Sequence, residues 1–149
     1  MATYDQLTEW AGLGHVTRAG RDVVAGWRIP DSPKAQLAEV GIPVAPRLIE
    51  RVVMQSEAEP TLMPDGEAWF ANSSVGVWLD VLHHYGSRVT ASELLSEPDG
   101  PEEYFSEEEE ERAFAELHRL AEELKEIDPA AFSGDEGFLW PGLLDRWLY

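Results

Sequence analysis

The clearest pattern of apolar positions runs from Glu107 to Ile127, where large apolar side chains recur every three or four residues. This spacing predicts a long helix with one buried face. Ser106 and Glu109 stand at the spacing of a capping box, which fixes the start of the helix. Asp128-Pro129 ends it, because a residue before proline avoids the α region.

Two further stretches show the same helical period. Tyr4 to Leu13 predicts a short helix that Gly12 and Gly14 end. Val75 to Tyr85 predicts a second helix with five large apolar side chains on one face. Ser73 or Ser74 is expected to cap this second helix. Gly86 is expected to end it, because glycine readily adopts the left-handed conformation found at helix C-termini.

Other segments read as extended or short helical structure. Val23 to Ile29 alternates in the manner of a strand, and Ser32-Pro33 predicts the start of a helix over Ala35 to Val40. Between Arg47 and Ala71, two apolar runs flank a proline-containing turn and predict a hairpin. From these patterns we expect several helices and a small sheet.

The C-terminal segment from Phe138 to Tyr149 is rich in leucine and tryptophan. Such a concentration is expected to dock on the body of the protein. Trp140 and Trp147 then serve either as lids over the core or as contacts for a partner, whereas Trp69 and Trp78 are expected in the core. With 149 residues, 44% of them hydrophobic, the chain fits a single domain over residues 1–149.

Charge changes this picture most. The chain has 29 acidic and 11 basic residues and a net charge of −18. So much negative charge repels nucleic acid and anionic membranes and attracts basic proteins. It also has a simpler interpretation, which is solubility. The acids concentrate in residues 101–149, where fifteen acids face four bases.

The composition also bears on location. The chain has no cysteine, as expected for a protein of a reducing compartment. Its first ten residues lack the basic and apolar pattern of a secretory signal, and no apolar run is long enough to span a membrane. We therefore expect a cytoplasmic protein.

No motif for catalysis, cofactor binding or metal binding stands out. Adjacent residues such as His83 and His84 point about 100° apart on a helix and chelate one metal poorly. His118 and Glu122 are at helical spacing, but no metalloprotease motif accompanies them. Nucleotide-binding glycine motifs are absent, and the serines at 73 and 74 are explained by capping. The sequence thus indicates neither an enzyme nor a cofactor.

A negative patch is the best candidate for a binding surface. Together with the two C-terminal tryptophans, the expected contact residues are Asp99, Glu102, Glu103, Glu107, Glu108, Glu109, Glu110, Glu111, Trp140 and Trp147. Such a patch favours a basic protein partner and mainly raises the rate of association. The alternative is that the glutamates are an ordinary solvated helical turn.

Several short motifs occur in a characteristic order: Trp27-Arg28-Ile29-Pro30, Gly41-Ile42-Pro43, Trp69 to Val75 with its Asn-Ser-Ser junction, Ile127-Asp128-Pro129 and a terminal tryptophan segment. In this order they resemble the bacterial SUKH superfamily, and most closely its fourth subgroup of immunity proteins. The stretch between Pro43 and Trp69 is shorter than the family's several central strands require, which indicates a reduced sheet.

The resemblance implies an α+β fold without catalytic residues and a role in neutralising a polymorphic toxin, of the nuclease or deaminase type, by binding it. Two other hypotheses stay open. The chain could be a regulatory or scaffold subunit that binds a host protein with no toxin involved. It could also be a small enzyme or metal site built around His118 and nearby acids.

Overall fold

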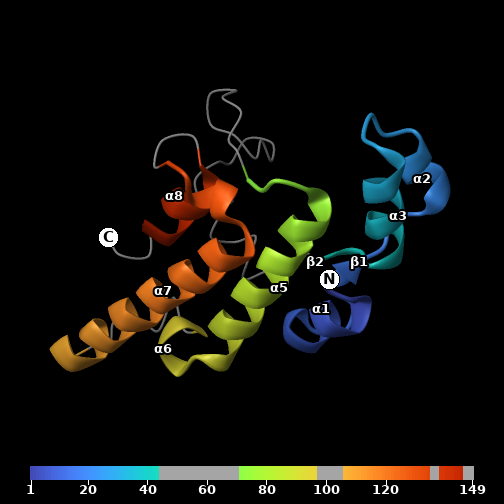
Figure 1. The fold of residues 1–149 in the computed structure, drawn as a ribbon. Coiled ribbons are helices and arrows are strands. Elements are labelled where there is room, and N and C mark those ends of the chain that lie inside the picture. The colour runs from blue at the N-terminus through green and yellow to red at the C-terminus, as the bar shows by residue number, and fades with distance from the viewer. Residues whose placement is uncertain (44–70, 97–105, 135–137, 146–149) are drawn as a thin grey trace, which may run out of the picture.

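The computed structural model describes residues 1–43, 71–96, 106–134 and 138–145 (Figure 1). Its elements are, in chain order, α1 (Tyr4–Ala11), β1 (Val16–Thr17), α2 (Arg21–Ala25), α3 (Asp31–Glu39), β2 (Ile42–Pro43), α5 (Val75–Ala91), α6 (Glu93–Ser96), α7 (Glu107–Ile127), the 3₁₀ helix η2 (Pro129–Phe132) and α8 (Leu139–Asp145).

Helices make up most of the described chain, beside a small antiparallel sheet. In this sheet β1 pairs with β2, with Val16 opposite Pro43 and Thr17 opposite Ile42. The expected α+β class is thereby confirmed. The hairpin predicted between Arg47 and Ala71 lies, apart from its last residue, outside the described residues.

The predicted helix boundaries are confirmed where local chemistry sets them. α7 spans the predicted residues, with Ser106 as its cap and both halves of the capping box formed with Glu109. Ser74 caps α5 by accepting a hydrogen bond from the Val77 N–H. α1 begins after Thr3, which forms a second capping box, and ends at Gly12 with φ of 95°.

The prediction of an extended run over Val23 to Ile29 is wrong, because Arg21–Ala25 forms helix α2. Val24 becomes buried where α2 packs against α3. This tertiary contact outweighs the weak preference of β-branched residues for strands. The predicted cap of α3 is also wrong, since Pro30 occupies the cap position and Ser32 lies inside the first turn.

The end predicted for α5 at Gly86 is wrong as well. The helix continues to Ala91, and Gly86 is a buried position within it. A Cβ atom at this position would lie 2.4 Å from Cε3 of Trp10 on α1. Glycine is therefore required by the close approach of α1 and not by a turn.

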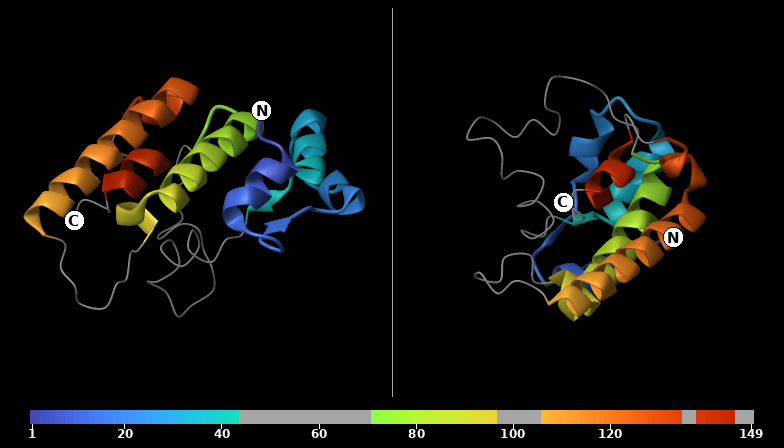
Figure 2. Two further views of the ribbon diagram at one scale, coloured as in Figure 1. Left: turned by 90° about the horizontal axis from the view of Figure 1, so that it is seen from below. Right: turned by 90° about the vertical axis from the view of Figure 1, so that its left-hand side faces the viewer.

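Helix α5 lies between the N-terminal elements and α7, as both views agree (Figures 1 and 2). Leu79 belongs to a cluster of buried side chains with Leu7 and Val16, whereas Val81 packs in a second cluster with residues of α7. Two residues turn a helix by about 200°, so these side chains face opposite ways. Trp78 packs against both clusters, and its expected place in the core is confirmed.

A network of hydrogen bonds joins the two ends of the second cluster. The Asp128 carboxylate follows α7 and is only 3% exposed. Its Oδ2 atom accepts hydrogen bonds from the Ser73 N–H at 2.8 Å and from Asn72 Nδ2 at 3.0 Å. Trp140 Nε1 on α8 donates to Asn72 Oδ1 at 2.8 Å. We call these four residues the Asp128 junction.

The balance of forces at this junction favours the ionised carboxylate. Burial raises the pKa of Asp128, but the hydrogen bonds from Ser73, Asn72 and the Ala130 backbone together outweigh it and hold the pKa below its ordinary value. The junction therefore fixes the start of α5, the end of α7 and α8 relative to one another.

Replacing Gly86 with alanine tests the packing of α1 on α5. At an exposed position within a helix, replacing glycine with alanine raises the free energy of unfolding by about 1 kcal/mol. At Gly86 the added methyl group meets the Trp10 ring, so we expect a loss of about 1–3 kcal/mol in the free energy of unfolding. Urea unfolding followed by tryptophan fluorescence measures it. The matched control is Gly76→Ala on the same helix, where the atoms nearest to the new Cβ belong to the flexible end of the Gln36 side chain. Equal effects of the two substitutions would contradict this account.

Replacing Asp128 with alanine leaves the Ser73 N–H and the Asn72 amide without their acceptor. We expect a loss of about 2–4 kcal/mol in the free energy of unfolding at pH 7, from about 1–3 kcal/mol for each buried unpaired group. Asp128→Asn keeps an acceptor oxygen and costs less.

The same residue predicts a pH dependence. The folded pKa is depressed, so the charge of Asp128 stabilises the fold above the ordinary carboxyl pKa and ceases to do so as the pH falls through the folded value. The stability difference between the wild type and Asp128→Asn should therefore shrink in acid. A difference that is constant with pH would contradict the assignment.

Candidate protein-binding surface

The first turns of α7 carry five consecutive glutamates, Glu107 to Glu111, which we call the acidic end of α7. Successive helical residues are about 100° apart, so five of them point to every side of the axis. Glu107, Glu108, Glu110 and Glu111 are exposed, and Glu109 is partly exposed. The acidic end is therefore negative all around its circumference.

The capping box explains why so much like charge is tolerated here. The Ser106 hydroxyl accepts a hydrogen bond from the Glu109 N–H at 3.3 Å, and Glu109 Oε2 accepts one from the Ser106 N–H at 2.9 Å. The Ser106 N–H, together with the Ser106 hydroxyl, lowers the pKa of Glu109. The positive end of the helix dipole also stabilises the neighbouring carboxylates.

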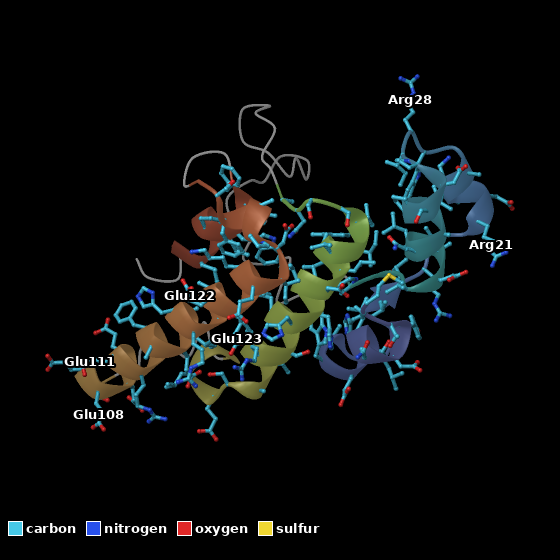
Figure 3. The ribbon with its side chains drawn as sticks, in the orientation of Figure 1. Arg21, Arg28, Glu108, Glu111, Glu122 and Glu123 are labelled. Atoms are coloured by element: carbon cyan, nitrogen blue, oxygen red, sulfur yellow. The ribbon has the colours of Figure 1, made fainter. Side chains whose placement is uncertain are left out.

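The acidic end lies beyond the part of α7 that is packed in the core. The buried residues of α7 are Leu117, Leu120 and Leu124, and at a rise of 1.5 Å per residue Glu111 precedes Leu117 by about 9 Å along the axis. Figure 3 shows Glu108 and Glu111 at the far end of the helix, pointing away from the body. The carboxylates are therefore open to a partner from several directions.

A cluster of charged side chains fixes α7 against α5. Arg88 of α5 donates through Nε to Glu123 Oε2 at 2.9 Å and through its terminal nitrogen to Glu123 Oε1. His84 Nε2 lies 2.7 Å from Glu123 Oε2. We call His84, Arg88 and Glu123 the α5–α7 ion cluster. Hydrogen bonds from Arg88 and His84 lower the pKa of Glu123 to about 2.

A second contact anchors α7 closer to its acidic end. The Ser92 hydroxyl, at the C-terminus of α5, donates to the Glu116 carboxylate and also accepts a hydrogen bond from the Leu95 N–H at 3.2 Å. Ser92 thus connects α5, α6 and α7. On the N-terminal side of Glu116, no residue of α7 is buried, so the acidic end contributes no side chain to the core.

The structure corrects the expected role of Trp140 as a partner contact. Its side chain is only 1% exposed and packs in the core, where its ring centroid lies 5.5 Å from that of Tyr85. The docking of the C-terminal segment is confirmed for its described part, because Trp140 and Leu144 are both buried. Asp99, Glu102, Glu103 and Trp147 lie outside the described residues.

The structure separates the histidines that were considered as metal ligands. His84 contacts Glu123, whereas His83 Nδ1 lies 3.3 Å from Ser87 Oγ. Burial lowers the pKa of His83, and the adjacent His84 lowers it further, against the opposing effects of acidic neighbours. In the described part of the chain, no group of three or more His, Asp or Glu residues is placed to hold a metal ion.

A comparison with known protein families gives a match over residues 50–146, more than half of the chain, to the model of the SUKH-4 immunity protein. The chain belongs to the SUKH-4 immunity protein family. No curated protein and no solved structure matches this SUKH-4 chain. The match contains α5, α6, α7, η2 and α8, and therefore includes the acidic end of α7 and the Asp128 junction.

Among the described residues of this SUKH-4 chain, no helix combines the length and apolar character that crossing a membrane requires.

Sequence reasoning missed the α5–α7 ion cluster and the exposed apolar side chains of α2. In the first case the only available signal was that His84, Arg88 and Glu123 each lie beside an apolar stripe, a position shared by many surface residues. In the second case Val23 to Ile29 was wrongly assigned as a strand. The exposure of Val23 and Trp27 was therefore not predicted.

Replacing Glu123 with glutamine tests the α5–α7 ion cluster. We expect a loss of up to about 1 kcal/mol in the free energy of unfolding at pH 7, because the Arg88 side chain is about half exposed and its ion pair is screened by water. Glu122→Gln is the matched control, since Glu122 is exposed and forms no ion pair with another described residue.

The titration of Glu123 gives a second measurement. Its folded pKa of about 2 lies below the ordinary 4.5, so its charge stabilises the fold fully above about pH 4.5 and loses this effect as the pH falls toward 2. Carbon-detected NMR of the Glu123 carboxyl group should show a midpoint near 2. A midpoint near 4.5 would show that the cluster does not form in solution.

Proposed function

We propose that this chain is an immunity protein that neutralises a bacterial toxin domain by binding it directly, in the cytoplasm and without catalysis. Membership of the SUKH-4 immunity protein family carries the proposal. The surface charge supports the mode of action, because a chain with a net charge of −18 is attracted to basic proteins.

The partner that fits this charge is a basic toxin domain. Nucleases and nucleic-acid deaminases bind polyanions through lysine and arginine side chains. An acidic helix end that enters such a surface competes with the nucleic acid for the same cations. This chemistry favours a nucleic-acid-directed toxin.

The acidic end of α7 is the proposed contact. Its exposed carboxylates surround the helix axis, and the capping box and the α5–α7 ion cluster support their position. A rigidly held charge loses little conformational freedom on binding. Asp99, Glu102 and Glu103 precede it closely in the sequence, and Trp147 stays in the proposal as a C-terminal contact.

Co-expression tests the function. Candidate toxin genes from the neighbourhood of this gene are each expressed in a sensitive host with and without this chain, and for the cognate toxin we expect growth only with it. Purified toxin and immunity protein should then form a complex. Failure to restore growth, with both proteins present and folded, would refute the immunity function and favour a regulatory or scaffold subunit.

The contact is tested with two variants of equal charge change. Glu108→Lys/Glu111→Lys reverses two charges at the acidic end, whereas Glu122→Lys/Glu126→Lys reverses two exposed charges elsewhere on α7. We expect the first variant to lower the association rate constant about ten-fold or more at low salt, with a smaller change in the dissociation rate. Stopped-flow fluorescence measures both rates. Equal effects of the two variants would assign steering to net charge and not to the acidic end.

A further inference from the structure

One edge of the contact between α5 and α7 is polar. His84, Arg88 and Ser92 follow one another at intervals of four residues, so they lie in one row on the surface of α5. On α7 this row meets Glu116 and Glu123, which are seven residues apart and therefore also share a face. The two helices are thus joined along this edge by carboxylates of α7 and polar side chains of α5.

Ser92 is the last residue of this row. Its backbone N–H donates to the Arg88 carbonyl at 3.1 Å, which fixes its backbone to the last turn of α5. Its hydroxyl accepts a hydrogen bond from the Leu95 N–H at 3.2 Å, and Leu95 is buried in the same cluster as Leu117 of α7. The same hydroxyl donates to the Glu116 carboxylate. Because one hydroxyl makes both bonds, the direction of each constrains the other.

Glu116 is the first residue of α7 that a polar side-chain contact fixes to another helix. In the described part of the chain, the hydrogen bonds of Ser106 and Glu109 stay within the capping box, and no hydrogen bond or ion pair joins residues 107–115 to α5 or α6. The buried residues of α7 begin at Leu117. The acidic end is therefore a projecting arm, and its direction is set from Glu116 onward.

A projecting helix amplifies small changes at its base. From Leu117 to Glu108 the helix axis is about 14 Å long. A tilt of about 10° at Leu117 therefore moves the backbone of Glu108 by about 2 Å. Such a displacement exceeds the range of distances over which a carboxylate forms a charge-assisted hydrogen bond with lysine or arginine.

Apolar packing constrains such a tilt less than a hydrogen bond does. Leu117, Leu120 and Leu124 pack in one cluster with Val81 of α5, but hydrophobic contact has no preferred direction. Hydrogen bonds are directional, and polar pairs beside an apolar seam set the orientation of paired helices. The polar edge is therefore the part of the contact that can define the direction of α7.

We propose that Ser92 is a positioning residue of the acidic end and sets the direction in which Glu107 to Glu111 project from the body. It acts through Glu116 and without any charge of its own. The inference rests on the proposed function, in which the acidic end enters a basic toxin surface. It adds that binding depends on an uncharged residue at the base of the projecting arm.

Spin labels measure the direction of the acidic end without any toxin. The chain has no cysteine, so a Glu108→Cys/Asp5→Cys variant takes up label only at the acidic end and at an exposed position of α1. In this background we expect Ser92→Ala to shift or broaden the distance distribution from double electron–electron resonance by about 2 Å or more. Glu116→Ala removes the same hydrogen bond and should do the same, whereas Ser92→Thr keeps the hydroxyl and should retain the parent distribution. An unchanged distribution in Ser92→Ala would overturn the proposal.

Ser87→Ala is the matched control. Ser87 is also a partly exposed serine of α5, but its hydroxyl lies 3.3 Å from Nδ1 of His83 on the same helix and forms no hydrogen bond with a described residue of α7. We expect this variant to leave the distance distribution unchanged. An equal shift in both serine variants would assign the effect to a general loosening of α5 and overturn the role of Ser92.

Binding kinetics then connect this direction to the toxin. Ser92→Ala leaves the net charge at −18, so the association rate constant should stay within about two-fold of the parent value. We expect the dissociation rate constant to rise about three- to ten-fold, because a looser acidic end loses more conformational freedom on binding. An unchanged dissociation rate in a variant whose distance distribution has shifted would overturn the proposal.

The failure of this inference is distinguishable from the failure of the proposed function. If the parent chain binds no candidate toxin, the proposed function fails, and the distance distributions still decide whether Ser92 directs the acidic end. If the parent chain binds a toxin and Ser92→Ala matches it in both measurements, only the inference about Ser92 fails.

Discussion

A buried carboxylate joins the start of α5, the end of α7 and α8. Asp128 is ionised although it lies in the core, because its Oδ2 atom accepts hydrogen bonds from Ser73 and Asn72, and Asn72 in turn accepts one from Trp140. A buried charge without such donors costs several kcal/mol. The junction therefore forms only when the start of α5, the end of α7 and α8 come together. It couples the placement of these three elements to one another.

Helix α5 connects these elements to the N-terminal part of the molecule. One of its faces packs on the N-terminal elements through Leu79, and the opposite face packs on α7 through Val81. The α5–α7 ion cluster adds a polar contact at the edge of the second face. The protein thus presents two different exteriors on either side of one central helix: an acidic helix end, and the region of α2 with exposed Val23 and Trp27.

The two exteriors differ in how far they were predictable. The acidic end of α7 was visible in the sequence because both of its causes are local: a run of five glutamates and the capping box of Ser106 and Glu109. The exposure of Val23 and Trp27 was not, because it depends on how α2 packs against α3. Trp140 was assigned to a partner contact for a similar reason. Its indole N–H has a buried partner in Asn72, 68 residues away, which no local pattern reveals.

By itself the sequence determined the features that act within a few residues: the start and end of α7 from Ser106 and Asp128-Pro129, the cap of α5 at Ser74, and the sign of the surface around Glu107 to Glu111. Hydrogen bonds and steric clashes between residues close in the sequence are sufficient to set these helix boundaries, and the charge of the glutamates sets the sign of the surface. The tertiary structure alone decided that Gly86 stays helical, that Val23 and Val24 form a helix, and that Trp140 is buried. In each case a contact with a distant segment outweighs a local preference of about 1 kcal/mol.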